Sequence, residues 1–300
     1  MDRLLLIYNP VAGDGFFKDN LDDVVALLQK KGYQVIVHRT SNDQDLDLIF
    51  NNSKGFINAV TAAGGDGTIH HVVNAMLKNN LIHIPLGIIP VGTSNDIANY
   101  LGIPSSFFDA IHIIGNRKVK NIDVGEVNGS CFVNVASGGL LMEVPHTTSV
   151  RLKNLAGRLA YYLKGIEQLP NLRPIPVKIS CPEETVEEEI LLFIILNGSI
   201  AGGFKNLAPA ASMTDGKLDV LVFKPVPIAR LLSVFVKILR GDHFRDASLK
   251  YFQTAGPIEI TCEADVGTDV DGEKGPDFPM YIKLRKGVLP VFVPPVNLIN

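Results

Sequence analysis

The chain is 300 residues long, with 46% hydrophobic and 20% charged residues. This composition is typical of a globular protein and excludes collagen-like, coiled-coil and disordered chains. The length suits one large domain or two medium ones. The 31 acidic residues outnumber the 28 basic ones, for a net charge of −3, which argues against a protein that binds nucleic acid mainly through its phosphates.

The cysteines and the apolar runs indicate in which cellular compartment the protein works. Cys131, Cys181 and Cys262 are far apart and lack a metal-binding spacing, so a reducing cytoplasm fits best. The apolar start of the chain is too short for a signal peptide and has no cleavage site. The longest apolar runs, such as residues 190–196, fall short of the ~20 residues that span a bilayer. We expect a cytoplasmic protein that can still touch a membrane.

The first third of the chain alternates between strand-like and helix-like segments. Apolar runs predict strands, and apolar residues at helical spacing predict helices between them. The predicted strands are residues 4–8, 34–38, 59–63 and 86–89, and the predicted helices are residues 21–28, 45–51, 69–77 and 96–101. This alternation predicts a parallel sheet covered by helices on both faces.

Beyond about residue 121 the period changes to two, which predicts a mostly antiparallel β-sandwich or barrel. Its predicted strands are residues 122–127, 131–136, 177–181, 189–197, 218–223, 258–262 and 280–285, interrupted by helices at 153–169 and 227–239. We therefore expect an α/β fold in two parts, a parallel-sheet domain at 1–120 and a β-rich domain at 121–287. Residues 288–300 are a candidate for returning to the first domain.

The sequence Gly64-Gly65-Asp66-Gly67-Thr68 lies between a predicted buried strand and a helix. Glycines let a backbone approach a ligand closely. Thr68 could cap the helix, and the free N–H groups at its start favour an anion. Asp66 would repel a phosphate unless Mg²⁺ lay between them. The plainer alternative is a tight turn that needs glycine.

Two further loops follow predicted strands in the same way. Residues 92–96 (Gly-Thr-Ser-Asn-Asp) open a helix, and residues 9–15 follow the first strand. Because successive parallel strands end at one edge of a sheet, these loops should line a common crevice. Ser94 or Asn95 could equally be a simple helix cap, and the first loop is weak evidence alone.

Four motifs in order carry a family resemblance. They are Asn9-Pro10-x-x-Gly13, Gly64-Gly65-Asp66-Gly67-Thr68, Pro90-x-Gly92-Thr93-x-Asn95-Asp96 and Val270-Asp271-Gly272-Glu273. Together they resemble the bacterial diacylglycerol kinase and related lipid kinase family, within the NAD-kinase-like superfamily, over nearly the whole chain. The glycine motif alone is shared with NAD kinases and is similar to one in 6-phosphofructokinases, so the first and last motifs favour a lipid kinase.

The resemblance implies a nucleotide-binding first domain, with ATP and Mg²⁺ as cofactors. The implied ATP-binding residues are Asn9, Pro10, Val11, Ala12, Gly13, Thr40, Gly65, Asp66, Gly67, Thr68, Ile69, His70, His71 and Thr93. It also implies that Asp66 and Asp96 organise a water-linked magnesium network with Asp215 and Asp271.

For the second domain, the resemblance places the general base in the stretch that contains Asp271 and Glu273, with the glutamate favoured. It places a second, structural Mg²⁺ at the Asp215 carboxylate with the backbone carbonyls of Ser212 and Lys217. Taken alone, residues 213–217 are an ordinary Asp-Gly turn, and the acidic stretch could be a solvated loop. If extended, Asp271 and Glu273 would share a face, and like charges raise a carboxyl pKa.

The chain departs from the family pattern at two places. His70-His71 stands where the family often has Asn-Glu, which leaves the nucleotide contacts of both residues in doubt; packing beside the buried stripe is the alternative. Ala12 replaces a small hydroxyl residue. A basic, aromatic-bearing segment could lie on an anionic membrane or pack on its own domain; its basic residues are Arg151, Lys153, Arg158, Lys164 and Arg173.

The sequence therefore predicts phosphoryl transfer from ATP to the primary hydroxyl of diacylglycerol, giving phosphatidate in a cleft between the domains. The protein would meet its lipid at the inner membrane face, bind no nucleic acid, and is compatible with a homodimer. Three alternatives stay open: an NAD kinase, a lipid kinase for another hydroxyl lipid, and a non-enzymatic nucleotide- or lipid-binding protein. The complete acid set weighs against the last.

Overall fold

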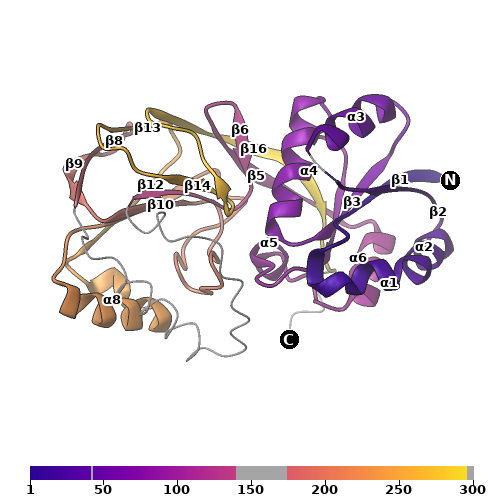
Figure 1. Ribbon diagram of the computed structural model, residues 1–300, viewed down its shortest axis with the longest axis horizontal. Helices are drawn as coiled ribbons and strands as arrows, with labels where there is room; N and C mark the ends of the chain where they lie inside the picture. Colours follow the sequence, from indigo (N-terminus) through magenta and orange to yellow (C-terminus); the bar gives the residue numbers. More distant parts are fainter. Residues whose placement is uncertain (42, 140–173, 296–300) are drawn as a thin grey trace.

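The computed structural model describes residues 1–41, 43–139 and 174–295. Two domains lie side by side, the N-terminal one on the right of Figure 1 and the second on the left. The basic segment that contains the predicted helix at 153–169 lies outside the described residues.

The first domain is built on a parallel sheet of order β2-β1-β3-β4. Its strands are β1 (Asp2–Tyr8), β2 (Tyr33–Arg39), β3 (Ala59–Gly64) and β4 (Leu86–Pro90). Its helices are η1 (Ala12–Gly15), α1 (Phe16–Asp19), α2 (Leu21–Lys30), α3 (Asp43–Ser53), α4 (Asp66–Lys78), α5 (Asp96–Tyr100) and α6 (Phe107–Asn116). α2 packs with α6 and α3 packs with α4. Every residue of β3 and β4 is buried, as expected for strands covered on both faces.

The second domain is a sandwich of two antiparallel sheets. One contains β12 (Leu249–Thr254), β11 (Leu218–Phe223), β10 (Leu192–Leu196), β7 (Val135–Gly139), β14 (Thr268–Val270) and β15 (Glu273–Lys274), in that order. The other contains β16 (Met280–Phe292), β13 (Ile258–Cys262), β8 (Ile175–Ser180), β9 (Thr185–Ile190), β5 (Val119–Val127) and β6 (Ser130–Phe132). α8 (Ile228–Arg240) and η3 (His243–Arg245) lie outside the sheets. In β8, Ile175, Val177 and Ile179 are buried and alternate with more exposed residues, because one face packs against the other sheet.

The strand β16 joins the two domains. Its first half pairs with β13 and β5, and its end runs parallel to β4, with Val291 opposite Leu86. Met280 lies in the core of the second domain, whereas Leu289 lies in the core of the first. The parallel sheet and one sheet of the sandwich are therefore one continuous sheet.

Two predicted strands are divided in the structure. The predicted strand at 131–136 becomes β6 and β7, and the one at 189–197 overlaps β9 and β10. In both cases the chain changes sheet within the predicted strand, and the residues at the corners, 132–134 and 190–192, are buried, so hydrophobicity gives no sign of the corner. The strand β12 and the β14–β15 hairpin were not predicted.

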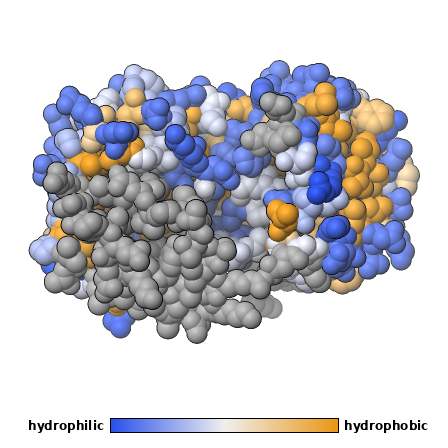
Figure 2. All heavy atoms as spheres, viewed as in Figure 1, coloured by the Kyte–Doolittle hydropathy of each residue, from blue (hydrophilic) through white to orange (hydrophobic). Residues whose placement is uncertain are grey.

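The surface differs between the ends of the molecule. On the face shown in Figure 2, hydrophobic residues gather at the right-hand end, over the first domain. There β2 is the edge strand of the sheet, and its Val37 is exposed. No helix among the described residues is both long and apolar enough to span a membrane.

Candidate active site

The loops after β1, β3 and β4 are in backbone contact. A Cβ on Gly13, which has φ +58°, would lie 2.4 Å from the carbonyl oxygen of Val91. A Cβ on Gly92 would lie 2.4 Å from the Cα of Gly65. Glycine is needed at these positions because the backbones approach too closely for any side chain.

A hollow of about 420 Å³, which we call the loop cavity, lies beside these loops. It is lined by Asn9, Pro10, Val11, Arg39, Thr40, Ser41, Leu46, Thr68 and His71. Six residues expected at ATP are therefore around one hollow. Of the others, Ala12 and Gly13 form η1, Thr93 is exposed in the loop after β4, and Ile69 is buried in the core of the first domain.

The helix α4 begins beside this hollow. Its N-cap is Gly65, and Thr68 lies in the first turn. The expectation that Thr68 caps the helix was wrong: its side chain packs so closely on Gly64 that a Cβ there would overlap it. The start of a 13-residue helix therefore faces the loops without a side-chain cap, which leaves its N–H groups for an anion.

Asp66 caps a neighbouring helix instead of its own. Its carboxylate accepts hydrogen bonds from the backbone N–H groups of Asp96 and Ile97, both at 3.1 Å, which are the first two residues of α5. Burial raises the pKa of Asp66, the two N–H donors oppose that rise, and the nearby charge of Asp271 adds to it. The N-cap residue of α5, Asn95, bonds back to Gly92.

A second hollow of about 320 Å³, the acid cavity, lies where the domains meet. Among the residues that line it are four aspartates (Asp66, Asp96, Asp269 and Asp271) and five apolar residues (Val135, Ile194, Ala201, Phe204 and Leu207). Asp96 reaches across the domain boundary, since both of its oxygens lie 3.2 Å from the N–H of Gly203. The sheet edge of one domain and the sandwich of the other thus share a cavity.

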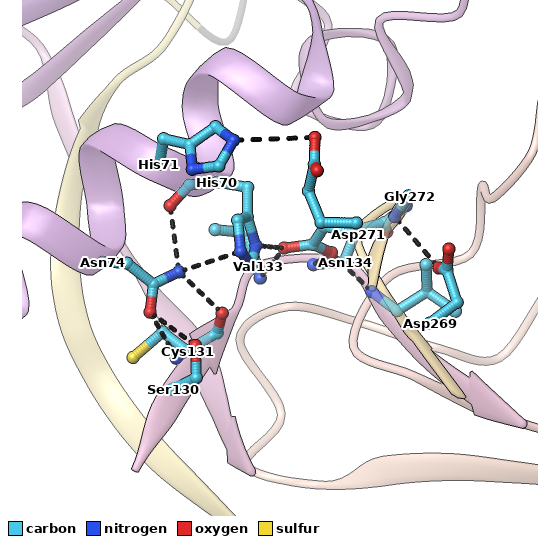
Figure 3. A network of polar contacts seen from close by, with 12 residues as sticks. His70, His71, Asn74, Ser130, Cys131, Val133, Asn134, Asp269, Asp271 and Gly272 are labelled. Carbon is cyan, nitrogen blue, oxygen red and sulfur yellow. Dashed lines mark hydrogen bonds and ion pairs between the residues drawn. The ribbon is translucent and has the colours of Figure 1, made fainter. Parts of the chain in front are cut away.

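Asp271 lies in the tight turn between β14 and β15. Asp271 and Gly272 have φ +54° and +92°, which is the pattern of a two-residue hairpin turn with Asp-Gly at its centre. Its carboxylate accepts from the backbone N–H groups of Val133, Asn134 and Val135 at 2.7–2.9 Å. A fourth contact joins it to His70 Nδ1 at 3.2 Å (Figure 3).

Glu273 has a different environment from Asp271, so the expectation of a shared face was wrong. The positive φ of Asp271 turns the chain, and Glu273 follows on β15 with its side chain 45% exposed. Its Oε1 lies 3.6 Å from His71 Nε2 and 2.9 Å from where a Cβ of Gly67 would be. Glu273 therefore lies against the first turn of α4.

The two histidines divide between the two acids. His70 is buried against Asp271 and does not line the loop cavity, whereas His71 lines that cavity and faces Glu273. His71 therefore lies where the expected contact with a nucleotide could form. For His70 the geometry matches the alternative of packing.

The residues expected at a second magnesium lie in one turn, away from both cavities. The N–H of Lys217 donates to Asp215 Oδ1 at 3.0 Å, and the N–H of Asp215 donates to the Ser212 carbonyl at 3.3 Å. Nearby Asp219 is buried, and its Oδ2 has no hydrogen-bond partner among the described residues. Burial raises the pKa of Asp219, and the charge of Asp215 raises it further. Asp215 is not among the residues that line the loop cavity or the acid cavity.

Several residues at the site were missed by the sequence argument. The backbone N–H groups of residues 133–135 and of Gly203 carry no side-chain pattern that could reveal them. Asn74 pairs with Cys131 across the domain boundary, and a single asparagine on a helix has no distinctive spacing. The Gly202-Gly203 pair was a readable sign of a close backbone approach.

Family models match the two halves of the chain. Residues 3–127 match the diacylglycerol kinase catalytic domain, and residues 135–293 match the YegS C-terminal NAD kinase beta sandwich-like domain. A parallel-sheet domain with glycine loops, joined to a sandwich that supplies acids, is thus the arrangement of a kinase.

Relatives specify which kinase. The chain is 37% identical to a diacylglycerol kinase of Bacillus subtilis (strain 168) over 278 residues, 92% of this chain and 91% of that one. It is 33% identical to one of Staphylococcus haemolyticus over 94% of this chain and 86% of that one. A crystal structure of a diacylglycerol kinase from Bacillus anthracis str. Sterne matches with a TM-score of 0.76 and 26% identity, over 98% and 97% of the two chains. The chain belongs to the bacterial diacylglycerol kinase family of lipid kinases.

Proposed function

We propose that this lipid kinase transfers the γ-phosphoryl group of ATP, with Mg²⁺, to the primary hydroxyl of diacylglycerol and produces phosphatidate. The observation that carries the proposal is the acid cavity, where buried carboxylates and an apolar wall lie within one hollow. A lipid substrate and a metal-bound phosphoryl group need both surroundings, because the acyl chains must leave water while carboxylates hold the metal.

The loop cavity is the proposed place for ATP. Residues near the start of α4 line both hollows: Thr68 and His71 line the loop cavity, and Asp66 lines the acid cavity. The uncapped N–H groups of α4 and the glycine backbones suit a phosphate chain. The γ-phosphate would then lie near the helix start, within reach of both hollows.

Among the acids, Glu273 is the proposed general base and Asp271 is not. Both oxygens of Asp271 are already occupied by two N–H donors each, so little acceptor capacity remains for an alcohol proton. Glu273 is about half exposed, lies against the first turn of α4, and lines a third hollow with His70, His71 and Asn74 rather than the acid cavity itself. A carboxylate with free lone pairs near the phosphate site is what alcohol deprotonation requires.

Magnesium fits the donor set at both proposed places. Mg²⁺ usually keeps several waters and is held by one or two carboxylates plus phosphates, so Asp66 and Asp96 suffice once a nucleotide binds. When bound there, Mg²⁺ would neutralise the charge on the transferred phosphoryl group. Among residues 1–41, 43–139 and 174–295, no three His, Cys, Asp or Glu side chains form a metal-binding group by themselves.

The second proposed magnesium belongs to the Asp215 turn. Its donors would be the carboxylate of Asp215 and the carbonyls of Ser212 and Lys217, which are hard oxygen ligands. The unpartnered Asp219 Oδ2 beside this turn supports the assignment, because a cation there would offset two neighbouring negative charges. We further propose that the enzyme works at the inner face of the cytoplasmic membrane, where its substrate lies.

The test is a radiolabelled-ATP assay over a panel of acceptors, with and without EDTA. Diacylglycerol in mixed micelles should yield labelled phosphatidate only when Mg²⁺ is present. If the label appeared in another lipid, such as phosphatidylglycerol or a sphingoid base, diacylglycerol would be the wrong acceptor. Label in NAD would overturn the assignment as a lipid kinase.

Single substitutions test the division of roles between the acids. Glu273→Gln should lower kcat by about 10²–10⁴-fold, while the exposed Glu259→Gln on β13 serves as a matched control for loss of one charge. If Glu273→Gln and Asp271→Asn both stay near the wild-type rate, the assignment of the acceptor side to this hairpin is wrong.

A further inference from the structure

The imidazole ring of His70 connects the two domains at the proposed site. It is buried on α4, with Nδ1 3.2 Å from Asp271 Oδ2 and Nε2 3.3 Å from Asn74 Nδ2 (Figure 3). Its two nitrogens thus face one group from the second domain and one from its own helix.

Asn74, one helical turn further along α4, has its amide fixed by β6. Its Oδ1 accepts from the backbone N–H of Cys131 at 2.6 Å and from Ser130 Oγ at 3.0 Å. Its Nδ2 donates to the carbonyl of Cys131 at 2.9 Å and to the carbonyl of His70 at 3.0 Å. These three contacts with β6 distinguish the amide oxygen of Asn74 from its nitrogen. The NH₂ group is therefore the part of the amide that faces His70.

These contacts determine the tautomer of His70. A carboxylate at Nδ1 can only accept, so Nδ1 must donate, and the amide NH₂ of Asn74 beside Nε2 disfavours a hydrogen on that nitrogen. The neutral ring therefore carries its hydrogen on Nδ1 and donates it to Asp271. The other three N–H donors of Asp271 come from residues 133–135 of the second domain.

We propose that His70 is a positioning residue, which ties the Asp271 turn to α4 and so holds Glu273 against the start of that helix. Glu273 is two residues beyond Asp271 on a two-residue strand, so a shift of the turn moves Glu273 with it. The kinetic consequence rests on the proposed function, since it assigns the base role to Glu273. A displacement of about 1 Å at a reacting group can cost up to about 10²-fold in rate.

Two variants separate positioning from mere packing. His70→Leu fills similar space without a donor, whereas His70→Asn places an amide Nδ2 where the ring Nδ1 was. We expect His70→Leu to lower kcat by about 10- to 100-fold with KM for ATP little changed, and His70→Asn to recover most of that loss. A wild-type kcat in His70→Leu, or an equal loss in both variants after correction for folded fraction, would overturn the proposal.

A spectroscopic measurement decides the geometry independently of activity. Long-range ¹H–¹⁵N NMR of the wild-type histidine rings, assigned by loss of one ring's signals in His70→Asn, should report the Nδ1–H tautomer for His70. Asp271→Ala should shift that ring's nitrogen signals, whereas Glu259→Gln should not. An Nε2–H tautomer would overturn the positioning role even in an active kinase. If the wild type transfers phosphate to no lipid, the proposed function fails and the NMR result still stands.

Discussion

The contact between two glycine loops makes a sharp prediction for Gly92→Ala. A Cβ at residue 92 would lie 2.4 Å from the Cα of Gly65 and 3.2 Å from its nitrogen. Ordinary contact begins near 3.4 Å, so the loops after β3 and β4 must separate by about 1 Å. The closest of these atoms is backbone, and the Asn95 Oδ1 at 2.8 Å belongs to a side chain that is itself held by hydrogen bonds to the Gly92 backbone.

The cost can be estimated from that separation. Overpacking of this kind destabilises by about 1–3 kcal/mol, and alanine's smaller loss of chain entropy offsets less than 1 kcal/mol. For 300 residues, with an unfolding entropy of about 2.1 cal/mol/K per residue, a net cost of ~1–2 kcal/mol lowers Tm by about 2–3 °C. A 1 Å displacement of phosphate-holding loops should cost up to about 10²-fold in kcat/KM for ATP.

Thermal unfolding and initial rates at varied ATP check both numbers. Gly115→Ala is the matched control, because residue 115 lies in α6, where alanine favours the helix and a new Cβ meets the flexible Lys31 side chain. It should leave the rate unchanged. A Gly92→Ala enzyme with wild-type kcat/KM for ATP would refute the idea that this loop pair holds the nucleotide.

Two other changes follow from the buried carboxylates. Asp66→Ala should abolish phosphoryl transfer while circular dichroism shows a folded protein, because it removes a charge proposed for magnesium and the acceptor for two N–H groups of α5; unchanged turnover would reject the metal role. Asp246→Asn should destabilise by about 1.5–3 kcal/mol at pH 7, because Lys237 Nζ at 2.6 Å and Ser248 hold the pKa of Asp246 far below its usual range. Because the pKa of Asp246 is lower in the folded state than in the unfolded state, its contribution to stability is complete above the unfolded pKa near 4 and decreases as the pH falls below that value. The unfolding free energies of the wild type and the variant, measured by urea titration, should therefore converge below about pH 4. A difference that stays constant over that range would contradict this explanation.

The alternation of apolar runs and helical spacing was enough to predict the parallel sheet, because β1, β3 and β4 are almost wholly buried and each strand is bounded by a turn. It was not enough for the sandwich corners, where β9 ends at the buried Ile190 and the mostly buried β10 begins at Leu192 without a polar residue between them. The unpredicted strand β12 has mostly half-buried residues and a polar sequence, Leu-Lys-Tyr-Phe-Gln-Thr. Its pairing with β11 is a long-range contact that local pattern does not express.

In the candidate site too, some features could be predicted from the sequence and others could not. The loops were predictable because glycines must follow parallel strands wherever backbones meet, and Gly13, Gly65 and Gly92 do meet. The roles of the acids were not predictable, because Asp66, Asp96 and Asp271 each bind backbone N–H groups that are distant in sequence. Asp271-Gly272 was a readable hairpin turn, and recognising it would have separated Asp271 from Glu273.

Those backbone contacts explain how so many carboxylates share one cavity. Charges of one sign in a buried space repel, as the raised pKa of Asp66, caused first by burial and then in part by Asp271, reflects. Each of Asp66, Asp96 and Asp271 offsets that cost with N–H donors, and in doing so joins a loop, helix or turn to its neighbour. A carboxylate saturated in this way fixes geometry but has little capacity left for a proton. Glu273 lies 3.6 Å from His71 and is half exposed, so it keeps that capacity. The proposed roles therefore follow the number of backbone donors around each acid, which is why Glu273 and not Asp271 is proposed as the base.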